Sequence, residues 1–131
     1  MKSLLYTTNG SAQVVIAGGT TLNVGSVIRR YGNNANVVDG NVAVQGSGFY
    51  NIDAHIDISA DAIGTMTITL YKDGIAIPGA STTISTEATG RYSIEIPATI
   101  RQVCCQMSTI TIEVSGGAGT VNSVSVRVVK E

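Results

Sequence analysis

Alternation between apolar and polar residues runs through most of this chain and constrains its fold more than any other feature. In the clearest segment, residues 49–58, every second residue from Tyr50 to Ile58 is apolar, and the residues between them are polar. Successive side chains of a β-strand point to opposite faces of a sheet. The segment therefore predicts a strand with one buried face and one wet face.

The same alternation recurs around residues 65–71, 91–101, 109–114 and 123–128, whereas helical periodicity is hard to find. We therefore expect two packed antiparallel sheets and no helix longer than about two turns. The residues expected between the sheets are Ile52, Ile56, Ile68, Leu70, Ile94, Ile96, Ile112 and Val126.

Turn residues separate the apolar segments. Asp39-Gly40 and Asp73-Gly74 each lie between two such segments, and Asp-Gly at that place is a strong signal for a hairpin. Pro97 interrupts its segment, which indicates a bend or an edge strand. With shorter segments near the N-terminus, the sequence predicts an all-β chain of eight to ten strands. We expect an antiparallel two-sheet sandwich or jelly roll that forms a single domain over residues 1–131.

The charge pattern excludes several classes of partner. The chain contains eight Lys and Arg residues and nine Asp and Glu residues, which gives a net charge of −1. Arg29-Arg30 is the one adjacent basic pair. This gives no basic footprint for nucleic acid. No apolar stretch is long enough for a membrane span. The apolar start ends at Tyr6, which is too short for a signal peptide. We expect a soluble protein, synthesised in the host cytoplasm, that reaches any other place by cell lysis or by assembly into a particle.

Catalytic chemistry has little support in the sequence. The chain has one His, no Gly-x-Ser-x-Gly motif, and no lysine or helix start after the glycines of residues 116–119. We expect no enzyme activity, no catalytic residues and no cofactor.

Asp53, His55 and Asp57 form the one cluster of possible metal ligands. They share the polar face of one predicted strand, with neighbouring side chains about 7 Å apart. That distance is too great for one strand to complete a metal shell, although a facing strand or threefold-related copies would add ligands. The interpretation that we favour is a solvated polar stripe without a metal.

Cys104 and Cys105 are neighbours, and two ligands are too few for a structural zinc site. We expect reduced thiols beside a strand end, with a covalent link or a metal between subunits as the alternative.

Several short motifs resemble those of known families. Gly48-Phe49-Tyr50-Asn51-Ile52 and the segment 67–74, ending Lys72-Asp73-Gly74, resemble strands of the jelly rolls of tumour necrosis factor (TNF) and of complement globular heads. The Ile77-Pro78-Gly79 segment and the alternating C-terminus are similar to the C-terminal domains of spore-surface collagen-like proteins. The segments 1–9 and 27–32 resemble small proteins of phages and prophages of gut Firmicutes.

The resemblance implies a TNF-like jelly roll that packs around a threefold axis as a homotrimer. Without a Gly-x-y stalk, it implies a structural module of a phage or prophage virion: a capsid decoration, head-fibre or fibre-tip protein. One alternative is the head of a receptor-binding fibre that recognises a cell-surface glycan or protein. Another is a spore or cell-surface assembly protein.

A trimer needs apolar groups outside the core. The strand faces that are otherwise polar carry three large apolar residues, Phe49, Tyr71 and Val129. Leu5 belongs to an N-terminal strand that is able to cross to a neighbouring subunit. We therefore expect Leu5, Phe49, Tyr71 and Val129 at the trimer interface.

Overall fold

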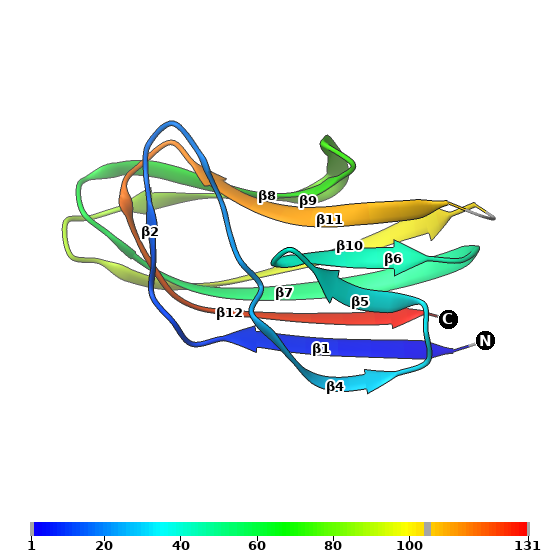
Figure 1. Cartoon of the computed structure of the whole chain (residues 1–131). Coiled ribbons are helices and arrows are strands. Elements are labelled where there is room, and N and C mark those ends of the chain that lie inside the picture. The colour runs from blue at the N-terminus through cyan, green and yellow to red at the C-terminus, as the bar shows by residue number, and fades with distance from the viewer. Residues whose placement is uncertain (1, 104–105, 131) are drawn as a thin grey trace.

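The computed structural model describes residues 2–103 and 106–130, which fold into two antiparallel sheets that face each other (Figure 1). The strands of the first sheet, here called sheet A, follow the order β10 (Arg91–Gln102), β7 (Gly48–Ala60), β12 (Gly119–Lys130), β1 (Ser3–Asn9) and β4 (Ser26–Tyr31), and β2 (Gln13–Val15) also pairs with β12. Those of sheet B follow the order β5 (Ala35–Val38), β6 (Asn41–Gln45), β11 (Met107–Ser115), β8 (Gly64–Lys72) and β9 (Ile75–Thr86), and β3 (Thr20–Thr21) also pairs with β11.

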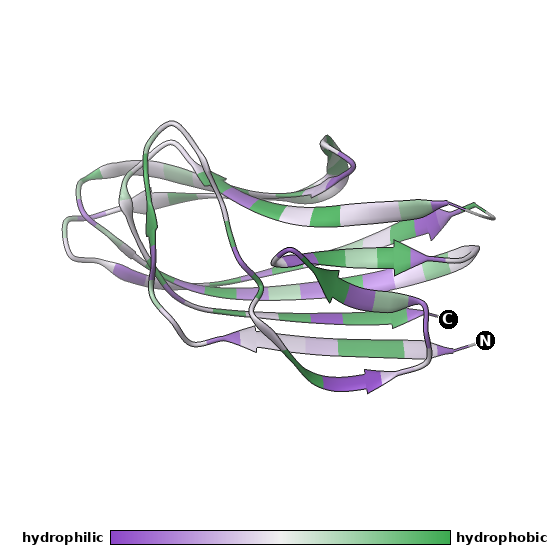
Figure 2. Cartoon of the chain, in the orientation of Figure 1, coloured by the Kyte–Doolittle hydropathy of each residue, from purple (hydrophilic) through white to green (hydrophobic). Residues whose placement is uncertain are grey.

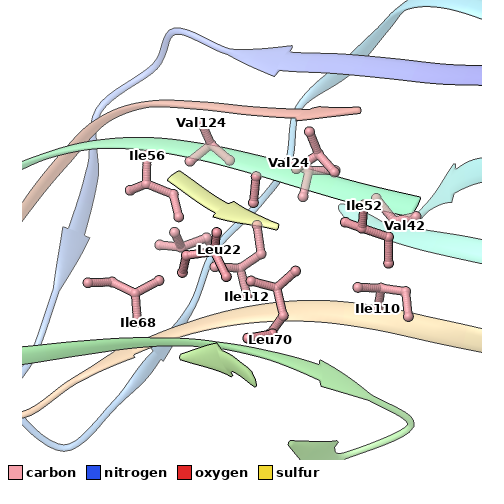
Figure 3. Packing of buried hydrophobic residues seen from close by; sticks show 14 of the residues in the cluster. Leu22, Val24, Val42, Ile52, Ile56, Ile68, Leu70, Ile110, Ile112 and Val124 are labelled. Carbon is pink, nitrogen blue, oxygen red and sulfur yellow. The ribbon is translucent and has the colours of Figure 1, made fainter. Parts of the chain in front are cut away.

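The core lies between the sheets and is aliphatic. Figure 2 shows hydrophobic and hydrophilic residues alternating along the long strands, and Figure 3 shows how residues from facing strands, such as Ile56 and Ile68, meet in the interior. All eight residues expected in the core are buried. The alternation along β7 also has the predicted register, because Asp53 is exposed while Ile52 and Ala54 are buried.

The two Asp-Gly pairs form the predicted hairpins. Asp39-Gly40 joins β5 to β6, and Asp73-Gly74 joins β8 to β9. Both Asp residues have φ of 51°, followed by 78° at Gly40 and 82° at Gly74. Positive φ at both central residues is the signature of a type I′ turn, whose twist matches that of the flanking strands.

The strand count differs from the expected eight to ten, because twelve strands form within the described residues. Strand β2, of three residues, overlaps one of the short segments expected near the N-terminus, whereas β3, of two residues, is too short for alternation to reveal it. The edge position inferred from Pro97 is confirmed, since β10 is the outermost strand of sheet A. No helix in the described part of the chain is long and apolar enough to cross a membrane.

Candidate assembly surface

The side of sheet A that faces away from the core, here called the outer face of sheet A, gathers most of the site residues expected from the sequence. Cross-strand register places Phe49, Asp53 and His55 of β7 on this face, together with Val129 of β12. Tyr6 of β1 lies beside Arg127 of β12 on the same face. The surface is therefore built by side chains that strand alternation turns away from the core.

One end of this face is apolar. Leu4 pairs with Val129 on one side and with Tyr31 on the other, which gives a continuous row across three strands. Phe49 lies diagonally across from Val129, because its neighbour on the same face, Asn51, is the direct partner of Val129. The side chains of Phe49 and Tyr31 are 55% and 67% exposed. Aromatic residues exposed in a row of this kind are typical of protein interfaces.

Ion pairs cover the middle of the same face. Arg91 of β10 donates to both carboxylate oxygens of Asp57, from Nε at 3.0 Å and from Nη2 at 2.7 Å. This two-point contact lowers the pKa of Asp57, chiefly through the hydrogen bonds from Arg91. Arg127 Nη2 lies 3.4 Å from Asp53 Oδ2. His55 Nδ1 lies 3.7 Å from Glu95 Oε1.

The three candidate metal ligands thus have three separate partners. Asp53 contacts Arg127, Asp57 contacts Arg91, and His55 approaches Glu95. Within residues 2–103 and 106–130, no group of three His, Cys, Asp or Glu side chains is arranged to hold a metal ion. The arrangement is that of a polar stripe crosslinked to its neighbouring strands. Cys104 and Cys105 lie outside the described residues.

A shallow hollow of about 660 Å³ opens on the β10 side of this face. Asn51, Asp53, Thr99 and Arg127 contribute its polar groups, and Pro97 is among its apolar lining residues. The outer face of sheet A therefore combines an apolar row, a charged stripe and a concave area.

The four expected interface residues do not lie on one surface. Phe49 and Val129 share the outer face of sheet A, whereas Tyr71 lies on the opposite side of the molecule, on the outer face of sheet B. The expectation for Leu5 is wrong. Its side chain is 0% exposed and belongs to the core, because β1 pairs with β12 and β4 of its own chain and turns Leu5 inward.

Sequence reasoning missed Tyr6, Arg29 and Tyr31. The sequence does contain a signal for Tyr6, because it follows Leu5 and adjacent residues of a strand point to opposite faces. For β4 no such signal exists, because none of its six residues is buried.

Comparison of the whole fold with known proteins gives similar structures at low sequence identity. No family model and no curated protein sequence matches the chain. The structure of Eiger TNF from S. frugiperda is similar over 100% of this chain and 92% of that one, with a TM-score of 0.70 and 12% identity. The fold is a TNF-like jelly roll.

Two other solved structures share the TNF-like fold. The globular domain of zebrafish complement 1qA protein matches over 99% of this chain and 96% of its own, with a TM-score of 0.67 and 10% identity. The PRD1 vertex protein P5 matches over 98% of this chain and 72% of its own, with a TM-score of 0.61 and 9% identity. The expected resemblance to TNF and complement heads is therefore confirmed for the fold. The resemblances to phage and spore-surface proteins stay predictions.

Proposed function

We propose that this chain is a non-enzymatic assembly module that forms a homotrimer through the outer face of sheet A. The observation that carries the proposal is the apolar row of Phe49, Val129, Leu4 and Tyr31 on a TNF-like jelly roll, in which Phe49 and Tyr31 are exposed and Leu4 and Val129 are half-buried. Neighbours with this fold are typically trimers. Burial of the row in an interface removes apolar surface from water, which favours association.

A pair of matched variants tests which face assembles. Phe49→Lys puts a charge on the apolar row of sheet A, and Val38→Lys changes an apolar side chain, 48% exposed, on the edge strand of sheet B. We expect Phe49→Lys to shift the protein from trimer to monomer in sedimentation experiments, because desolvating the ammonium group is costly. Val38→Lys is expected to stay trimeric. The opposite result, with Val38→Lys dissociated and Phe49→Lys intact, contradicts the assignment of the face.

We further propose that the trimer is part of a phage or prophage virion, as a capsid decoration, head-fibre or fibre-tip protein. Support comes from the similarity to the PRD1 vertex protein P5, a phage vertex protein, and from the N-terminal resemblance to phage proteins. Localisation in the virion follows from this proposal.

Particle composition tests the virion proposal. Virions from the strain that carries the gene are purified after prophage induction, and their proteins are quantified by mass spectrometry. We expect the chain to band with the capsid protein in a density gradient, in a constant ratio to it. A chain that stays with the lysate proteins, or that is found in spores of uninduced cells, contradicts the proposal.

A further inference from the structure

Opposite charges lie at the two borders of the outer face of sheet A. Arg29 is on β4, which forms one edge of the sheet, and Glu95 is on β10, which forms the other. Arg29 is the cross-strand partner of Tyr6, and Glu95 is the partner of His55, so both side chains lie on the outer face. The borders of this one face are therefore chemically complementary.

Within the described residues, neither charge is neutralised by a close ion pair in its own protomer. Arg29 is exposed, its one side-chain hydrogen bond in the described residues is to the neighbouring Ile28 carbonyl at 3.1 Å, and no carboxylate there lies within 4 Å. The Glu95 side chain is 83% exposed, and its one ionic contact among residues 2–103 and 106–130 is with His55, at 3.7 Å. The two other acidic groups of this stripe, Asp53 and Asp57, already have arginine partners.

A threefold arrangement brings these two borders together. Three sheets that turn the same face towards a threefold axis line a triangular prism, and adjacent sheets meet at its corners. Because rotation relates the copies, each corner joins the β10 edge of one protomer to the β4 edge of the next. Such a contact is heterologous, and it closes into a ring that needs two different but complementary surfaces.

The positions of Arg29 and Glu95 along the strand direction are also compatible with such a contact. Register through Tyr6, Arg127 and Asp53 places Arg29 level with Pro97, two residues from Glu95 on β10. Two residues of strand are about 7 Å, a distance that a long arginine side chain spans. We propose that Arg29 of each protomer pairs with Glu95 of the next, so that three such pairs set the head-to-tail order of the homotrimer.

A groove at the β10 edge, further along the strand from Glu95, adds an apolar element to the same contact. Tyr31 of β4 is level with Thr99 of β10 through the row that contains Leu4, Val129 and Asn51. Thr99 borders a groove of about 440 Å³ between β9 and β10, whose apolar lining is formed by Ala76, Ile75, Ile77, Pro78 and Ile100. The exposed ring of Tyr31 from the next protomer fills this groove while Arg29 reaches Glu95. Aromatic anchors in pockets beside charged pairs commonly dominate interface energetics.

The charges also disfavour the competing twofold arrangement. Packing β4 against β4 brings Arg29 close to its own copy, and packing β10 against β10 does the same for Glu95. Like charges placed together suppress the wrong partner. The proposed pairing therefore selects a closed ring over a twofold dimer.

Charge reversal tests the pairing, which rests on the proposed trimer. The single variants Arg29→Glu and Glu95→Arg and the double variant are compared with wild type by sedimentation velocity over a concentration series. We expect each single variant to weaken assembly by tenfold or more and the double variant to recover most of that loss. Asp61→Arg, an exposed carboxylate in the turn between β7 and β8, is the matched control and is expected to assemble like wild type. Circular dichroism checks that every variant is folded.

The outcomes separate the pairing from the trimer. A wild-type chain that is monomeric at all concentrations overturns the trimer and the pairing together. A wild-type trimer whose single reversals assemble normally overturns the pairing alone. The pairing alone is also overturned if the double variant loses as much assembly free energy as the two single variants together, because additive losses mean that the residues do not face each other.

Discussion

Arg29 and Glu95 occupy opposite edges of one sheet face, with β1, β12 and β7 between them. The same face has the apolar row of Phe49 and Tyr31 at one end. In the proposed ring of identical copies, these two borders come into contact. This relationship links the TNF-like fold to the proposed assembly.

Truncation of a central core residue is expected to destabilise the fold strongly. Ile68 is 0% exposed and lies in the cluster between the sheets. Ile68→Ala removes buried methyl groups and leaves a cavity, so we expect it to lower the free energy of unfolding by about 2–5 kcal/mol. Urea unfolding followed by circular dichroism measures the change. Ile63→Ala, an exposed residue of the β7–β8 turn, is the control and is expected to change it by less than about 0.5 kcal/mol.

Asp57 makes a contribution to the stability of the fold that is lost in acid. Its pKa in the folded state is lowered by hydrogen bonds from Arg91. The stabilisation is therefore present above the ordinary carboxyl pKa of about 4 and is lost as the pH falls through the lower folded value. We expect wild type to be more stable than Asp57→Asn at neutral pH, and the difference to disappear in strong acid.

NMR titration checks the cause of this shift. In Arg91→Gln the pKa of Asp57 is expected to rise towards its ordinary value. A pKa of Asp57 that is the same with and without Arg91 contradicts the assignment.

Tyr50 anchors the turn that precedes Phe49. Its side chain is buried, and its hydroxyl group lies 2.8 Å from the carbonyl oxygen of Gln45 and 2.7 Å from that of Gly46. Tyr50→Phe leaves these acceptors without that donor, so we expect a loss of about 1–2 kcal/mol in the free energy of unfolding. Tyr71→Phe is the control, because in the described part of the chain the Tyr71 hydroxyl group makes no hydrogen bond. Equal effects of the two changes count against an anchoring role.

Removal of metal ions is expected to leave the fold unchanged. Asp53, His55 and Asp57 each face a different partner, so a cation has no shared position among them. Thermal unfolding with and without a chelator should give the same midpoint. A large drop that His55→Ala abolishes points instead to a metal bound between protomers, since a ligand of the folded state stabilises it by mass action.

Much of the fold was predictable because strand alternation and turn chemistry are local. The burial of Tyr50, Ile52 and Ala54 and the two Asp-Gly turns follow from short stretches of sequence. The pairing order of the strands depends on contacts between distant segments, which alternation does not encode. Sequence alone therefore did not separate Tyr71 on sheet B from Phe49 on sheet A.

The site was predictable only in part for the same reason. Parity marked Phe49 and Val129 as outward-facing, but the burial of Leu5 depends on β1 being inserted between β12 and β4. The arginine partners of Asp53 and Asp57 come from strands far away in sequence, at Arg127 and Arg91. These long-range pairs change a possible metal-binding stripe into a crosslinked sheet surface.

The mass of the protein in solution tests the central claim most directly. Light scattering coupled to size-exclusion chromatography at micromolar concentration is expected to give three times the 13.5 kDa of one chain. Stable oligomeric interfaces commonly bury more than roughly 2,000 Å² in total, which keeps such a trimer intact on dilution. A single species of 13.5 kDa at all concentrations contradicts the account.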